Sequence, residues 1–93
     1  MNYANQGLLL DEKFQGGRES VQMDWSEGRV RINPTSGELA EQELEYSEID
    51  FSVGGNRDSF LFLKTPKFGS AQAYVELTPE FRAFIHKHPI LGP

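Results

Sequence analysis

The fold is decided by the stretch Val21-Gln22-Met23-Asp24-Trp25-Ser26-Glu27-Gly28-Arg29-Val30-Arg31-Ile32. Apolar and polar residues alternate on both sides of the central Glu27-Gly28 pair. Because the side chains of a strand point alternately to the two faces of a sheet, this spacing predicts two strands that each have one buried face. An acidic residue followed by glycine is typical of a tight hairpin turn. We therefore expect these residues to form a β-hairpin.

Segments of the same kind occur on both sides of this hairpin. Clusters of glycine, proline, asparagine and serine separate them, which is typical of turns between strands. The segment Phe60–Leu63 is apolar at every position, as in a central strand that is covered on both faces. We therefore expect about seven strands, roughly between residues 7 and 77. The segments are 7–14, 18–25, 29–32, 38–46, 49–53, 60–63 and 71–77.

The segment Glu38–Tyr46 has two interpretations. Glutamate, leucine, alanine and glutamine all favour a helix. Leu44 and Tyr46, however, alternate with charged or polar residues, and the flanking segments have the pattern of strands. We prefer the strand and keep the helix as the alternative.

The chain ends differently, with the signals of a helix over about residues 79–88. Thr78 is a favourable N-cap, and Pro79 suits the first helical position. Large residues then recur at the spacing of one helical face, and Pro89 ends the helix. The residues of this face are Phe81, Phe84, Ile85 and His88.

Together, these elements predict a mainly β fold with one C-terminal helix. Strands joined by short turns pair as antiparallel neighbours, and a sheet of about seven short strands must curl to protect its edges. The apolar face of the helix can close one open end of the curled sheet. We expect most of the aromatic residues to form the core. This order of elements resembles that of pleckstrin-homology-like and GRAM-like domains, which implies a partial barrel of about seven antiparallel strands capped by the helix.

Length and charge limit what this protein can do. The chain has 93 residues, no cysteine and a net charge of −5, which predicts a single domain over residues 1–93. The negative charge disfavours binding to nucleic acids and to anionic lipid surfaces. No apolar run approaches the ~20 residues that span a bilayer. We expect a cytoplasmic protein that contacts membranes only indirectly, at their cytoplasmic face.

The residue sets that catalysis needs are missing. The two histidines, His86 and His88, would point to opposite sides of the expected helix, so they cannot chelate one metal ion. The sequence contains no Gly-x-Ser-x-Gly motif and no cysteine nucleophile. We therefore expect no catalytic residue, no metal and no cofactor. The remaining class is a non-enzymatic interaction or regulatory domain that binds a protein or peptide partner.

A second resemblance covers residues 14–63. Its parts are a Gly-Arg turn that leads into a strand, a short hairpin, a strand with an aromatic residue and then isoleucine, a glycine-rich turn, and an apolar strand. In this sequence they are Phe14–Met23, Trp25–Ile32, Leu44–Ile49, Gly54–Asp58 and Phe60–Leu63. The pattern is similar to an accessory domain that precedes the membrane-embedded peptidase of bacterial M48 (Ste24-like) zinc metallopeptidases.

This resemblance implies that the partner is a peptidase and membrane region C-terminal to Pro93. The peptidase motif His-Glu-x-x-His does not occur in the sequence. No catalytic residue of that family can therefore be assigned to any position of this chain.

An acidic strand and two loop residues are the predicted contacts with the partner. Six acidic residues and no basic residue lie within residues 38–50. Those that would share one strand face are Glu41, Glu43 and Glu45. Arg57, in a glycine-rich turn, and Phe68, beside another turn, complete the set. We expect a peptide to add to an exposed sheet edge or to lie between the helix and the sheet.

Two alternatives remain open. Arg18, Arg29 and Arg31 lie in or beside the first two turns, where pleckstrin-homology domains hold lipid phosphates. They predict a module that binds a lipid head group or another small anion, although acidic residues are their close neighbours. The other alternative is a small β-protein that associates with itself through a sheet edge.

Overall fold

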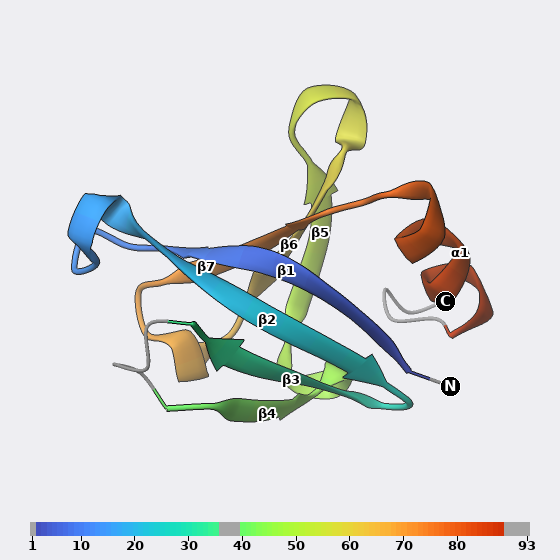
Figure 1. Cartoon of the computed structure of the whole chain (residues 1–93), viewed down its shortest axis with the longest axis horizontal. Helices are drawn as coiled ribbons and strands as arrows, with labels where there is room; N and C mark the ends of the chain where they lie inside the picture. Colours follow the sequence, from blue (N-terminus) through green and yellow to red (C-terminus); the bar gives the residue numbers. More distant parts are fainter. Residues whose placement is uncertain (1, 36–39, 89–93) are drawn as a thin grey trace.

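The computed structural model describes residues 2–35 and 40–88 (Figure 1). Within these ranges the chain forms seven strands, one α-helix and four short 3-10 helices. The strands are β1 (Tyr3–Leu10), β2 (Arg18–Ser26), β3 (Arg29–Pro34), β4 (Gln42–Glu45), β5 (Asp50–Gly54), β6 (Phe60–Lys64) and β7 (Gln72–Glu76). The helices are η1 (Gln15–Gly17), η2 (Tyr46–Glu48), η3 (Asn56–Asp58), η4 (Pro66–Phe68) and α1 (Pro79–Lys87).

All seven strands belong to one antiparallel sheet, in the order β4-β3-β2-β1-β7-β6-β5. The end strands β4 and β5 are consecutive in the chain. The link from Glu45 to Asp50 can span at most ~18 Å, whereas the edges of a flat sheet of this size lie ~29 Å apart. The sheet therefore curls into the half-barrel of Figure 1. The expected fold, a curled antiparallel sheet with one C-terminal helix, is confirmed.

Strand β1 joins the two halves of the sheet. It pairs with β2 along its whole length and with β7 through Gly7–Leu10. A Cβ atom at Gly7 would lie 2.6 Å from the carbonyl oxygen of Tyr74 and 2.9 Å from the Met23 side chain. Only glycine fits this close approach, so a larger residue at position 7 would push β1 away from β7 and from the Met23 side chain.

The hairpin that decides the fold forms as expected. Trp25 pairs with Val30 across the β2–β3 ladder, and Met23 pairs with Ile32. Gly28 supplies the positive φ of 81° that the turn requires. The alternating apolar residues all point inward and are buried. They form the centre of the core together with Leu61, Leu63 and Val75.

The C-terminal helix closes one end of the half-barrel, beside the start of β1 (Figure 1). Thr78 caps it, since its Oγ1 accepts a hydrogen bond from Phe81 N–H at 3.1 Å. Phe81 is fully buried, and its ring centroid lies 5.0 Å from Trp25 and 5.3 Å from Tyr3. The predicted cap and apolar face are confirmed, whereas Pro89 lies outside the described residues.

Segment boundaries differ from the expectation in two places. Strand β1 already begins at Tyr3 and ends at Leu10, because Tyr3 and Asn5, opposite the buried Trp25 and Met23, extend its inward face toward the N-terminus. In Glu38–Tyr46, the strand interpretation is confirmed for Gln42–Glu45. Tyr46 instead begins η2, and residues 38 and 39 lie outside the described part.

The expectation that most aromatic residues form the core is confirmed, and one group of three rings is the exception. Since Leu61, Leu63 and Ala73 point inward, their neighbours Phe60, Phe62 and Tyr74 lie on the outer face, half-buried. They cover one another, with the Tyr74 ring centroid 5.4 Å from Phe60 and 6.1 Å from Phe62. Strand β6 is therefore apolar on both faces for two reasons. Leu61 and Leu63 face the core, and Phe60 and Phe62 belong to a small aromatic cluster on the outer face. Val53 is also more exposed than expected, at 41%, because β5 is an edge strand.

Candidate functional site

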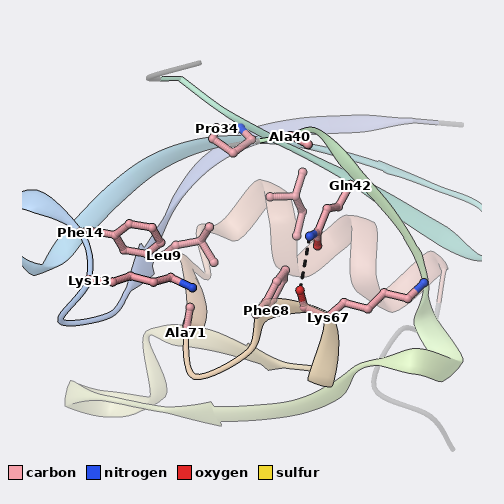
Figure 2. A pocket seen from close by; sticks show the side chains of 10 residues that line it. Leu9, Lys13, Phe14, Pro34, Ala40, Gln42, Lys67, Phe68 and Ala71 are labelled. Carbon is pink, nitrogen blue, oxygen red and sulfur yellow. Dashed lines mark hydrogen bonds between the residues drawn. The ribbon is translucent and has the colours of Figure 1, made fainter. Parts of the chain in front are cut away.

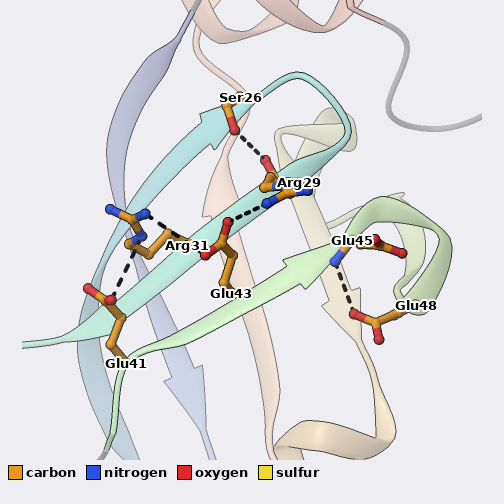
Figure 3. Close-up of polar contacts among 7 residues, drawn as sticks. All are labelled: Ser26, Arg29, Arg31, Glu41, Glu43, Glu45 and Glu48. Carbon is orange, nitrogen blue, oxygen red and sulfur yellow. Dashed lines mark hydrogen bonds and ion pairs between the residues drawn. The ribbon is translucent and has the colours of Figure 1, made fainter.

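The predicted acidic strand and two of the predicted arginines meet on the outer face of β3 and β4. The ladder places Arg31 opposite Glu43 and Arg29 opposite Glu45. Arg29 Nη1 lies 3.0 Å from Glu43 Oε1. Arg31 lies within 3.9 Å of Glu43 and 3.7 Å of Glu41 (Figure 3). The carboxylates of the predicted acidic strand and the arginines of the predicted anion site therefore partly neutralise each other's charge.

Arg18 lies apart from the other two arginines. It pairs with Leu10 at the beginning of β2, while Ser26 at the end of β2 pairs with Arg29. At ~3.3 Å per residue, the length of β2 separates Arg18 from Arg29 by well over 20 Å. The structure therefore does not bring Arg18, Arg29 and Arg31 together as one anion-binding cluster.

Arg57 lies at the tip of the β5–β6 hairpin, which projects from the half-barrel (Figure 1). Arg57 and Asp58 both have positive φ angles, 59° and 54°, and the Ser59 N–H donates to the Asn56 carbonyl at 3.2 Å. This is the geometry of a type I′ turn, which normally favours Asn-Gly, at the tip of a five-residue loop between Gly54 and Phe60. Helix α1 holds the hairpin, because Arg82 Nη2 donates to the Asp58 carbonyl at 2.7 Å.

Phe68 is buried, with 7% of its surface exposed. Its ring belongs to the wall of a cavity of about 110 Å³ at the end of the half-barrel that α1 does not cover (Figure 2). Residues from β1, β3, β4 and η4, and from the segments before η1, β4 and β7, form this cavity. They are Leu9, Lys13, Phe14, Ile32, Pro34, Ala40, Gln42, Lys67, Phe68 and Ala71.

Gln42 is the polar residue that distinguishes this cavity. It occupies an inward position at the start of β4, next to Ala40. Its Nε2 donates to the Lys67 carbonyl at 3.3 Å, which fixes the direction of the amide (Figure 2). Its Oε1 is buried and accepts no hydrogen bond within the described part of the chain. Leaving such an acceptor unsatisfied costs about 1–3 kcal/mol, so the site favours a ligand with an N–H or O–H donor.

Lys13 is the charged residue at this cavity. Its Nζ lies 5.5 Å from the centroid of the Phe14 ring and 3.8 Å from Asp11 Oδ2. A hydrogen bond from the Ser70 hydroxyl lowers the pKa of Asp11, and contacts with Lys13 add to this effect. Asp11 therefore stays ionised near neutral pH and holds Lys13 and Ser70 beside the cavity.

A shallow groove of about 380 Å³ runs along the outer side of β4. It is lined by Arg29, Glu43, Leu44, Glu45, Glu48 and Lys67. Lys67 Nζ lies 3.0 Å from Glu48 Oε1, and its hydrogen bond is the main cause that lowers the pKa of Glu48. The Glu45 N–H donates to Glu48 Oε2 at 3.0 Å and adds to the effect (Figure 3). The cavity and the groove share Lys67, so they are neighbours beside β4, and we treat them together as the candidate site.

Phe68, Glu43 and Glu45, which the sequence predicts as contacts, line the cavity or the groove, whereas Gln42 is not among the predicted residues. A signal was present, because Gln42 alternates in phase with Leu44 and therefore takes an inward position in the strand. No group of three residues that could hold a metal ion occurs within residues 2–35 and 40–88. Within the same ranges, no helix is long and apolar enough to cross a membrane.

The fold and the site define a β half-barrel with a side-chain-sized cavity at one end. Comparisons of the chain with models of known protein families, with curated proteins and with solved structures give no match. The function is therefore argued from the geometry of the site.

Proposed function

We propose that this protein is a non-catalytic module that binds an extended peptide segment of a partner protein. The cavity beside Phe68 receives one apolar side chain of that segment. The observation that carries the proposal is the unsatisfied Gln42 Oε1 in an otherwise largely apolar cavity. A peptide supplies both an apolar side chain and N–H or O–H donors, on its backbone and on its polar side chains.

The size of the cavity supports a side chain rather than a larger ligand. An engineered protein cavity of about 150 Å³ holds a benzene molecule, and this cavity is about 110 Å³. It therefore fits a side chain of the size of valine, leucine or isoleucine. Burial of such a side chain contributes about 1.5–3 kcal/mol, which suits weak and reversible recognition.

The alternative of a small-anion or lipid-head-group module has less support. Arg29 and Arg31 contact Glu41 and Glu43, and Arg18 lies at the other end of β2. An anion would have to compete with carboxylates for the same guanidinium groups. We therefore favour the peptide.

The resemblance of residues 14–63 to accessory domains of membrane-bound metallopeptidases makes a peptidase region the first partner to test. That choice of partner, and a location at the cytoplasmic face of a membrane, rest on the sequence pattern alone. The cavity supports the chemistry of the partner, an apolar residue in an extended segment, independently of this choice.

A phage-displayed library of random peptides, selected on the immobilised protein, tests the proposal. We expect the enriched peptides to share one apolar residue. The variant Ala40→Leu adds a side chain at the cavity wall from an exposed position, and Ala71→Leu adds one from the buried wall. Each should weaken binding at least about tenfold. The matched control Ala83→Leu lies on the exposed side of α1 and should leave affinity unchanged.

Three results would overturn the proposal. One is a selection without enrichment, and another is equal binding by the wild type and both cavity variants. The third is a set of strong nuclear Overhauser contacts between the Leu39 methyl groups and the Phe68 ring in the free protein, since the chain would then fill its own cavity. Sedimentation at rising concentration tests self-association in the same samples.

A further inference from the structure

The edge of the sheet beside the cavity carries a further inference. Strand β4 pairs with β3 on one side and is the end strand of the sheet on the other. The groove of about 380 Å³ borders β4 and is lined by Arg29 of β3 as well as by Glu48 and Lys67, which belong to neither β3 nor β4. The question is whether the backbone of β4 offers hydrogen bonds to an incoming strand.

The hydrogen-bonding pattern of the β3–β4 ladder shows which peptide groups of β4 point to the open edge. Neighbouring residue pairs of antiparallel strands alternate between pairs that exchange hydrogen bonds and pairs whose peptide groups point away from each other. The Tyr46 N–H donates to the Gly28 carbonyl at 3.0 Å, so the bonded pairs of the β3–β4 ladder include Leu44 with Val30 and Gln42 with Ile32. Glu43 therefore belongs to a non-bonded pair, and its N–H and C=O point to the open edge.

The neighbouring ladder gives the same phase independently. The Thr35 N–H donates to the Ser20 carbonyl at 3.0 Å, which makes Arg31 and Asp24 a bonded pair of the β2–β3 ladder. The peptide groups of Arg31 are thus engaged with β2. They cannot also bond Glu43, which is the partner of Arg31 across the β3–β4 ladder.

Glu43 lies directly beside the cavity residue Gln42. Residues that face each other across a ladder point to the same side of the sheet. In a segment added to β4, the residue opposite Glu43 would therefore point outward, toward the acidic residues of β4. Its neighbour opposite Gln42 would point inward, to the cavity. The sequence of such a segment alternates a basic with an apolar residue.

We propose that the partner segment adds to β4 as an eighth strand, exchanges two backbone hydrogen bonds with Glu43, and places a basic residue outside and an apolar residue in the cavity. This inference rests on the proposed function, because the apolar residue is the one that the cavity receives. Acidic residues outnumber basic ones along the groove, three to two. Glu45 has no ion-pair partner in the described ranges, so the basic residue has a carboxylate to contact.

A proline at Glu43 tests the backbone bonds. Glu43→Pro removes the N–H that points to the open edge and leaves the ladder with β3 intact, which is the one place where an edge strand accepts proline. The matched control Glu43→Ala also removes the contacts with Arg29 and Arg31 but keeps the N–H. With a peptide enriched on the wild type, calorimetry should give affinity about tenfold weaker for Glu43→Pro than for Glu43→Ala.

A second measurement does not depend on how well the proline variant folds. Hydrogen exchange of the Glu43 amide in the wild-type protein should slow about tenfold or more when the peptide is bound. Exchange of the Arg57 amide, on the distant hairpin, should stay unchanged. N-methylation of the peptide at the residue opposite Glu43 should weaken binding as Glu43→Pro does.

The outcomes separate the two proposals. Strand addition is wrong if peptides bind and Ala40→Leu weakens their binding, but Glu43→Pro binds them as Glu43→Ala does and the exchange rate of the Glu43 amide does not change. In that case the cavity remains the site. If no peptide depends on the cavity, the proposed function is wrong and strand addition is overturned with it. If the enriched peptides carry acidic residues next to the apolar one, the proposed charge pattern is wrong.

Discussion

Both ends of the half-barrel contain buried aromatic residues, but these residues are packed differently. At the closed end, the Phe81 ring of α1 packs against Tyr3 and Trp25, with centroid distances of 5.3 and 5.0 Å. At the open end, Phe68 packs beside a cavity of about 110 Å³, which α1 does not line. A ring that is enclosed by other rings, as Phe81 is, contributes to the stability of the fold. A ring that borders a cavity, as Phe68 does, leaves room for a ligand.

The largest test of this comparison is the loss of one aromatic ring at each end. Phe81→Ala should lower the free energy of unfolding by about 3–5 kcal/mol, because a fully buried ring leaves a new void. Phe68→Ala should cost less, because this ring already borders a cavity and lacks contacts on that side. Denaturation in urea measures both. Equal losses would mean that the two ends are packed alike.

The second test removes a hydrogen bond from the closed end. Trp25 Nε1 donates to Asn5 Oδ1 at 2.8 Å, and the Trp25 side chain is buried. Asn5→Ala should cost about 1–3 kcal/mol, because it leaves this N–H without a partner. The control Asn33→Ala, at an exposed position of β3, should change stability by less than about 0.5 kcal/mol. A similar result for both would show that water satisfies the indole.

How much of the fold and of the candidate site can be predicted from the sequence depends on how far apart in the chain the contacting residues are. The hairpin around Gly28 and the cap at Thr78 depend on neighbouring residues, so their local pattern predicts them. The cavity combines Leu9, Gln42 and Phe68 from three separate parts of the chain. Its shape depends on how far the sheet curls, which no local pattern specifies. The ion pairs of Arg29 and Arg31 with the acidic strand depend likewise on the β3–β4 register, which a longer connection sets.

The third test is a variant that should stabilise the open end. Gln42→Leu replaces the unsatisfied Oε1 with a methyl group and also removes the bond to the Lys67 carbonyl. We expect a net gain of about 1 kcal/mol in the free energy of unfolding together with weaker peptide binding. Gln6→Leu, on the exposed side of β1, is the control and should do neither. A stability loss for Gln42→Leu would show that its side chain is needed to hold η4 to β4.

The fourth test concerns the hairpin that Arg82 holds to the closed end. Asp58 has a φ of 54°, at the turn position that glycine prefers. Asp58→Gly should raise the free energy of unfolding by about 0.5–1 kcal/mol, and the Asp58 carbonyl that accepts from Arg82 is retained. Ser52→Gly, in the extended strand β5, should lower stability by a similar amount. Thermal unfolding measures both. Changes of the same sign would contradict the positive φ.

The smallest expected effect is a difference in the response of the two ends to acid. Asp11, bonded to Ser70, and Glu48, bonded to Lys67, have pKa values below their ordinary 3.8 and 4.5. Asp11 holds Lys13 beside the cavity, and Glu48 holds Lys67 of η4, which lines it, so both carboxylates support the open end. A carboxylate with a lowered pKa stabilises the folded state above its ordinary pKa, and this contribution is lost as the pH falls through the lowered value. Acid should therefore loosen the open end first.

Amide exchange at low pH, corrected for the intrinsic rate, checks this difference. Below about pH 4, the Gly69 amide, which donates to the Pro66 carbonyl at the open end, should lose protection earlier than the Leu77 amide, which donates to the Ser59 carbonyl near α1. The double variant Asp11→Asn, Glu48→Gln should remove the difference, because neither group then titrates. If Leu77 loses protection first, the closed end is the weaker one. The cavity would then be a consequence of poor packing throughout, and the case for a built binding site at Phe68 would lose its physical basis.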